Sequence, residues 1–135
     1  GLTGTAIVTT DGAAVQVPLN TAAAVTANGM TASGGGLVVP RTGRYRITFC
    51  VMATANINGA CSFIARCAAG AREYNGSTSY TATNGYAQQS TGSVTVALPA
   101  GQYVSLWAYK FGGAVTVKDA GGVIAANWLT VEEVV

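Results

Sequence analysis

The chain has 135 residues, which is the usual size of one domain, and half of them are hydrophobic. Only 9% are charged, against roughly 25% in an ordinary soluble domain. This composition excludes a disordered chain, which needs high charge, and argues against a helical bundle, whose exposed faces are rich in Glu, Lys and Arg. The net charge of +2 is too small to indicate nucleic acid or an acidic membrane surface as a partner.

Alternating polar and apolar residues, interrupted by turn dipeptides, run along the whole chain. Four Asn-Gly pairs, beginning at residues 28, 58, 75 and 84, supply the positive φ angles that tight hairpins require. No window has sustained helical periodicity, so an antiparallel sandwich or barrel is predicted. We predict strands at 5–10, 13–18, 22–26, 36–40, 44–54, 60–68, 77–82, 90–98, 102–110, 114–118 and 122–133. Residues 21–135 form one domain, and residues 1–20 are an N-terminal arm or a first strand that contacts a shell or a neighbouring subunit.

The alternation assigns core residues in the strand at 44–54. One face carries Tyr45, Ile47, Phe49, Val51 and Ala53, and this face is predicted to be buried. The opposite face carries Arg44, Arg46, Thr48, Cys50 and Met52. In the strand at 90–98 the inward residues are Val94, Val96 and Leu98.

The predicted strand at 102–110 has two apolar faces. Val104, Leu106 and Ala108 form one face, and Tyr103, Trp107 and Tyr109 form the other. Because a large aromatic surface commonly marks an interface, we predict that these three residues, with Trp128 of the last strand, pack against another copy of the chain. The alternative is a thicker monomer core that the N-terminal segment closes.

The three cysteines, Cys50, Cys61 and Cys67, contain no CxxC spacing, so no zinc site or disulfide framework is predicted. Cys61 and Cys67 share one face of a strand about 20 Å apart, too far for a disulfide. A hairpin through Asn58-Gly59 would bring Cys50 opposite one of them, but buried thiols are the preferred prediction. Buried thiols suit assembly in a reducing cytoplasm.

Arginines concentrate in one third of the chain, and they have two interpretations. Arg41, Arg44, Arg46 and Arg66 either form pairs with Glu73, Glu132 and Glu133, or form a basic patch that docks onto an acidic capsid or cell-surface polymer.

The stretch from Glu73 to Ser90 is polar and contains three tyrosines. Tyr and amide side chains suit contacts with sugars or proteins, so this stretch is the candidate ligand-binding loop. Its candidate residues are Tyr74, Asn75, Tyr80, Asn84 and Tyr86. The alternative is a polar loop whose tyrosines cap one end of the sandwich.

Nothing in the sequence favours catalysis. The chain has no histidine, which is the commonest general base and metal ligand. Lys110 and Lys118 have no partners that the sequence reveals. The glycines at 34–36 lack the lysine and helix start of a phosphate loop and are predicted to form a turn. No enzyme activity, cofactor or metal is therefore expected.

Three segments together resemble a known superfamily. The segment at 35–49 contains Pro40, Gly43 and Tyr45 before an alternating strand, and it resembles the start of the globular heads of complement first-component and tumour-necrosis-factor-like proteins. The segment at 92–107, with Ala100-Gly101 and an alternating strand, is similar to a second stretch of that family, and 124–131 stands at its closing strand. Gln102 replaces the family's usual acidic residue, which argues against its calcium site.

This resemblance implies an all-β, ten-stranded antiparallel jelly roll that assembles as a homotrimer. Bacteriophage virion proteins also use this head, and the charge-poor composition is similar to theirs. We therefore expect a non-enzymatic capsid decoration or cement protein on the outer surface of a phage head, assembled in the host cytoplasm, with the major capsid protein as its partner. The alternative is a trimeric fibre or tail-tip module that recognises a host surface glycan or receptor. Neither nucleic acid nor a membrane is an expected partner.

Overall fold

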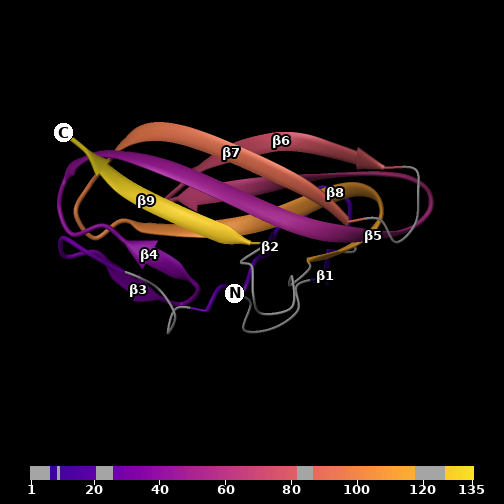
Figure 1. The fold of residues 1–135 in the computed structure, drawn as a ribbon, viewed down its shortest axis with the longest axis horizontal. Coiled ribbons are helices and arrows are strands. Elements are labelled where there is room, and N and C mark those ends of the chain that lie inside the picture. The colour runs from indigo at the N-terminus through magenta and orange to yellow at the C-terminus, as the bar shows by residue number, and fades with distance from the viewer. Residues whose placement is uncertain (1–6, 9, 21–25, 82–86, 118–126) are drawn as a thin grey trace.

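The computed structural model describes residues 7–8, 10–20, 26–81, 87–117 and 127–135, and these residues form an antiparallel β-structure without helices (Figure 1). The strands are β1 (Ile7–Val8), β2 (Val15–Gln16), β3 (Thr31–Ser33), β4 (Gly36–Val38), β5 (Gly43–Ala69), β6 (Arg72–Thr81), β7 (Ala87–Leu98), β8 (Tyr103–Val117) and β9 (Trp128–Val134). All of their pairings are antiparallel. The predicted all-β class is confirmed.

The 27-residue strand β5 belongs to two layers. Its first half lies between β7 and β9, and its second half lies between β6 and β8. Strand β8 continues the second layer to β4, and β4 pairs with β3. Figure 1 shows β7 and β9 beside the first half of β5, with β6 and β8 in the other layer. The two layers therefore share one continuous strand.

The predicted hairpin at Asn58-Gly59 does not form. Residues 58 and 59 lie inside β5, where a register irregularity separates Asn56 from Cys61. Strand β8 pairs with β5 on both sides of this irregularity, so one long partner keeps the strand continuous. Asn-Gly only permits a tight turn, and the ladder with β8 overrides that local preference. Cys50 and Cys61 are consequently not opposed across a hairpin.

Two other turns agree with the sequence. Asn28 and Gly29 both have positive φ, 54° and 82°, as a type I′ turn requires. Gly34 and Gly35, with φ of 57° and 82°, form the two-residue loop between β3 and β4. The prediction missed β3 because its three residues carry no extended apolar alternation.

Several predicted boundaries were wrong. The strands predicted at 102–110 and 114–118 are one strand, β8, which continues through Gly112 at a φ of 93°. Asn75-Gly76 lies inside β6, so the polar stretch after Glu73 is largely strand rather than loop. Residues 22–25 of one predicted strand and 122–126 of another lie outside the described residues.

The core between the layers is a single cluster. The predicted inward residues Tyr45, Ile47, Phe49, Val51 and Ala53 are all buried, as are Val104, Leu106 and Ala108 of β8. Leu98 is buried, and Val94 and Val96 pack against this cluster. The alternation in the sequence therefore predicted the buried faces of the first half of β5, of β7 and of β8 correctly.

The N-terminal strands lie along the edge of β8 that faces away from β5. Ile7–Val8 pairs with Val115 and Thr116, and Val15–Gln16 pairs with Trp107 and Ala108. Val8 and Val17 are fully buried in the core. The described residues of the segment 1–20 are thus part of the domain.

Candidate interaction surfaces

Alternation along β8 places a row of aromatic side chains on the outer face of its layer. Trp107 lies opposite Arg66 of β5, and Tyr109 lies opposite Ile64. The Arg66 guanidinium carbon is 4.0 Å from the centre of the Tyr109 ring, within the range of a cation–π contact. The Tyr109 and Phe111 rings meet edge to face with centroids 5.8 Å apart. Phe111, which the sequence analysis did not single out, is 50% exposed.

Two further aromatic contacts on β8, those of Trp107 and Tyr103, differ from each other. Trp107 is partly buried, and its Nε1–H donates to Ser105 Oγ at 2.7 Å. Tyr103 instead belongs to the β3–β4 hairpin, because its hydroxyl donates to Gly34 O at 2.7 Å and accepts from Gln16 Nε2 at 3.0 Å. We define the aromatic face as Trp107, Tyr109 and Phe111, since Tyr103 is occupied by contacts within the chain.

Trp128 lies on the other layer. It is opposite Cys50 in the pairing of β9 with the first half of β5, whereas Leu129, next to it, packs against the core. The Trp128 side chain is exposed. The structure therefore brings Tyr103, Trp107 and Tyr109 onto one strand but places Trp128 on a different layer.

The arginines of the predicted basic patch are likewise divided between the two layers. Arg44 and Arg46 lie on the exposed side of the first half of β5, while Arg66 lies on the second half, in the other layer. Each of three arginines has an acidic partner: Arg41 pairs with Glu133, Arg46 with Glu132 at 4.0 Å, and Arg66 with Glu73 at 3.0 Å. The predicted pairing of arginines with these acids is confirmed, and the residues do not form one patch.

The candidate ligand-binding residues are only partly described. Tyr74 packs against the core, and Asn75 Oδ1 accepts a hydrogen bond from Arg66 Nε at 2.8 Å. Tyr80 on β6 is 66% exposed. Asn84 and Tyr86 lie outside the described residues. Among the described members of this set, Tyr80 has the aromatic surface most accessible to a ligand.

A buried lysine is the feature that the sequence analysis missed. Lys110 of β8 is 3% exposed, and its Nζ donates to Asp11 Oδ1 and to Gly112 O. The backbone strengthens this contact, because Gly12 N–H donates to Lys110 O at 3.1 Å. The pair joins residues 99 positions apart, so no spacing in the sequence could reveal it.

The three cysteines are buried thiols, as predicted. Burial raises the pKa of Cys50, Cys61 and Cys67, and for Cys67 the pKa is raised to about 11. A raised pKa keeps a thiol protonated and therefore weakly nucleophilic near neutral pH.

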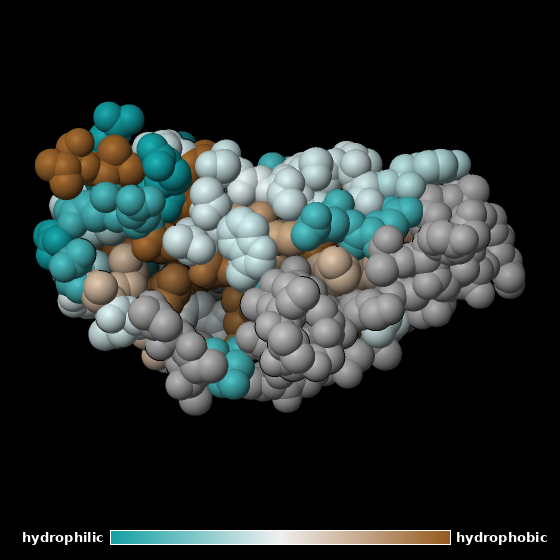
Figure 2. All heavy atoms as spheres, in the orientation of Figure 1, coloured by the Kyte–Doolittle hydropathy of each residue, from teal (hydrophilic) through white to brown (hydrophobic). Residues whose placement is uncertain are grey.

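A groove of about 840 Å³ opens between β9 and the β3–β4 hairpin. Its lining residues are Thr26, Ala27, Asn28, Met30, Leu37, Pro40, Arg41, Tyr45, Leu129, Thr130, Val131, Glu132, Glu133 and Val135. Figure 2 shows brown, hydrophobic atoms between teal, hydrophilic residues in the left half of this view, where β9 lies in Figure 1. The groove is therefore apolar at its floor and charged at its rim.

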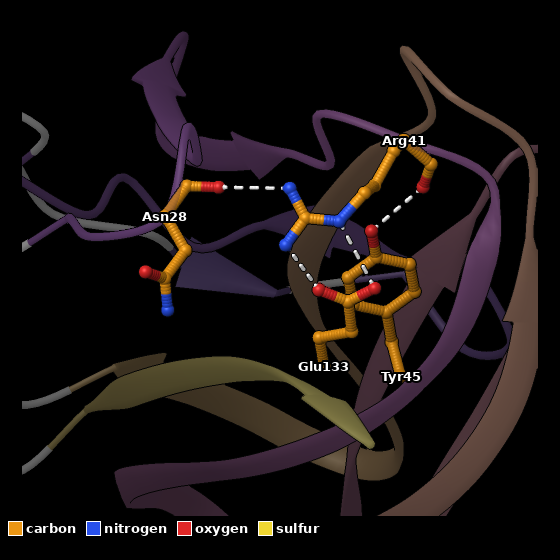
Figure 3. A network of polar contacts seen from close by, with 4 residues as sticks. All are labelled: Asn28, Arg41, Tyr45 and Glu133. Atoms are coloured by element: carbon orange, nitrogen blue, oxygen red, sulfur yellow. Dashed lines mark hydrogen bonds and ion pairs between the residues drawn. The ribbon is translucent and has the colours of Figure 1, made fainter. Parts of the chain in front are cut away.

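One end of the groove is fixed by a polar network (Figure 3). Arg41 donates from Nε to Glu133 Oε1 at 3.1 Å and from Nη2 to Glu133 Oε2 at 2.5 Å. Its Nη1 reaches Asn28 O at 3.5 Å, and Tyr45 OH donates to Arg41 O at 2.6 Å. The hydrogen bond and the charge of Glu133 raise the pKa of Arg41. This network joins the loop before β3 to the end of β9.

Within the described residues, no three His, Cys, Asp or Glu side chains are grouped closely enough to hold a metal ion. Among the same residues, no helix is long and apolar enough to cross a membrane.

No family model matches the chain, and no curated protein matches it. A solved structure does: the Eiger tumour necrosis factor of S. frugiperda superimposes with a TM-score of 0.60 at 12% sequence identity. The match covers 100% of this chain and 88% of the other. At this identity the likeness concerns the fold, and the chain has a TNF-like jelly-roll fold.

Proposed function

We propose that this chain is a non-enzymatic structural subunit that assembles as a homotrimer and decorates the outer surface of a phage capsid. The TNF-like fold supports the proposal, together with a composition in which only 9% of the residues are charged. The buried, protonated thiols are consistent with a structural role, since none of them is an activated nucleophile.

The aromatic face carries the proposal. Trp107, Tyr109 and Phe111 lie in a row on the outer side of β8, and half of Phe111 is exposed in the isolated chain. Aromatic residues are enriched at protein interfaces, where they contribute much of the binding energy. Covering this face with a neighbouring copy would remove it from water.

Sedimentation of the Trp107→Ala variant tests the assembly. We expect the wild-type chain to sediment as a trimer at micromolar concentration and the variant to dissociate, because truncating a central interface aromatic typically costs about 2 kcal/mol or more. Thr95→Ala, at an exposed position of β7, is the matched control and should remain trimeric. Trp128→Ala tests the other layer as the interface. If this variant alone dissociates, the interface lies on β9.

A stable monomer of the wild-type chain would overturn the trimer. The virion role has its own test, which is binding to empty capsids followed by heating. We expect the added protein to raise the temperature at which the capsids disrupt, and absence of binding would contradict the role as a decoration protein.

A second function has one observation in its favour. Tyr80 is 66% exposed on a polar strand, an arrangement that suits stacking against a sugar ring or contact with a receptor. Binding to a host glycan array without affinity for capsids, lost in Tyr80→Ala, would favour a trimeric receptor-binding module instead.

A further inference from the structure

We propose that the groove beside β9 binds an extended peptide segment of a partner protein, which adds to β9 as a further strand. The segment has alternating apolar side chains and carries a lysine or arginine. This mode of recognition uses main-chain hydrogen bonds for affinity and pockets for alternate side chains for specificity. The proposal concerns a different surface from the aromatic face and holds whether or not the chain is a trimer.

The outer edge of β9 is the first observation. Within the described residues β9 pairs with β5 alone. The direction of its amides follows from β5: Met52 N–H points toward the β9 side, where it donates to Asn127 Oδ1 at 2.9 Å. Amides alternate in direction along a strand, so Thr48, opposite Thr130, also faces β9. It follows that Leu129 and Val131 direct their N–H and C=O groups away from β5.

The position of the groove is the second observation. Five consecutive β9 residues, from 129 to 133, line it. Side chains of a strand alternate between its faces, so a run without gaps means that the groove runs along the edge of the backbone. An added strand placed there would meet the outward amides of Leu129 and Val131.

The side chains beyond the outer edge of β9 favour apolar residues in the added strand. Met30 and Leu37 lie in the wall opposite β9, and both are only partly buried. Leu129 and Val131 pack against the core and complete the floor. Every second side chain of an added strand would face this floor, which explains the requirement for alternating apolar residues.

The charges at the rim of the groove favour a lysine or arginine in the bound segment. Of the charged residues that line the groove, two are acidic, Glu132 and Glu133, and one is basic, Arg41. Arg41 forms its ion pair with Glu133. Glu132 has a 65% exposed side chain and only a 4.0 Å contact with Arg46. A lysine or arginine of the bound segment would complement Glu132.

A short synthetic peptide tests the proposal. The probe is N-terminally labelled Val-Thr-Val-Thr-Val-Lys, which places the valines on one face and the lysine on the other, with an amidated C-terminus; it is titrated with the full chain and followed by fluorescence anisotropy. We expect saturable binding, and we expect hydrogen exchange at Leu129 and Val131 to slow when the peptide is bound. The same peptide methylated on alternate amide nitrogens is the control and should not bind, because it lacks the main-chain donors.

Two variants examine the contacts separately. Val131→Pro removes an N–H that points away from β5, a change that edge strands tolerate, and it should weaken binding by about tenfold or more while thermal unfolding stays cooperative. Glu132→Lys should weaken binding of the lysine peptide and strengthen binding of a peptide ending in glutamate. Trp107→Ala should bind the probe like the wild-type chain, which separates this proposal from the trimer.

Three results would overturn the proposal. One is equal binding of the methylated peptide, which would mean adsorption to apolar surface without strand addition. Another is unchanged affinity in both Val131→Pro and Glu132→Lys. The last is slow exchange at Leu129 and Val131 before peptide is added, which would mean that the edge is already covered by the chain itself or by a second copy.

Discussion

Phe49 shows how single residues fit the two layers together. Its ring lies over Gly92, where a Cβ atom would come within 2.2 Å of Phe49 Cζ, and near Gly76, where the closest ring atom would be at 3.2 Å. Glycine at these positions serves close packing, and neither has a positive φ. The buried ring has no room to move, so the glycines are required by volume.

Gly92→Ala should therefore destabilise the fold by about 1–3 kcal/mol, the usual effect of overpacking a core. Urea unfolding measures this change, with Ser93→Ala on the exposed side of the same strand as the control. Because the clash is with one ring, Phe49→Leu should cost less in the Gly92→Ala background than in the wild-type chain. Additive effects of the two substitutions would contradict this explanation.

Cys67 gives the protein a pH dependence at the alkaline end. Burial raises the pKa of the folded thiol from 9.0 to about 11, so between these values the unfolded chain loses a proton that the folded chain keeps. Stability from this group is complete below pH 9 and is lost as the pH rises toward 11. We expect the free energy of unfolding to fall over this range, and to fall less steeply in Cys67→Ala. An identical slope in both proteins would contradict the assignment.

At the scale of elements, the N-terminal turn is attached to β8 by a charged contact. Lys110 is almost completely buried, and Asp11 is its acidic partner, while Gly12 N–H bonds to the Lys110 carbonyl. A buried ammonium group without a counter-charge is costly, whereas removing both charges together costs much less. The contact therefore holds the segment that carries Val17 into the core.

Asp11→Asn should destabilise the chain by about 1–3 kcal/mol, since it removes the negative charge that compensates the buried ammonium group. The Asp11 side chain is itself exposed, so the effect should be smaller than for a fully buried pair. Hydrogen exchange at Val17 should become faster. Adding Lys110→Met should recover much of the stability, and failure of this second change to do so would show that the ion pair is not the cause.

Strand β5 also explains which element predictions failed. Its alternation correctly gave the buried face of the first half, but the sequence could not show that the strand continues through residues 56–61. The continuity depends on pairing with β8, which lies about 50 residues further along the chain. The joining of two predicted strands into β8 has the same origin, because β8 pairs with β5 from Val104 to Val117, along almost its whole length.

At the scale of the whole molecule, one strand links both layers, and each layer has a distinct outer face. The β8 layer has the aromatic face and Arg66, and the β9 layer has Trp128, Arg44 and Arg46. Within the part of the chain that the structure describes, β9 pairs with β5 alone, and the groove runs beside its other edge. The aromatic face and the groove belong to different strands, so Trp107→Ala tests assembly and Val131→Pro tests peptide binding separately.

The sequence by itself determined the all-β class and the inward faces of the long strands. These properties depend on local alternation and composition, which are visible within a few residues. Only the tertiary structure decided the rest: the separation of Trp128 from Trp107, the division of the arginines, the Lys110–Asp11 contact and the groove beside β9. Each of these depends on which strands become neighbours, and that pairing is set by contacts between distant parts of the chain.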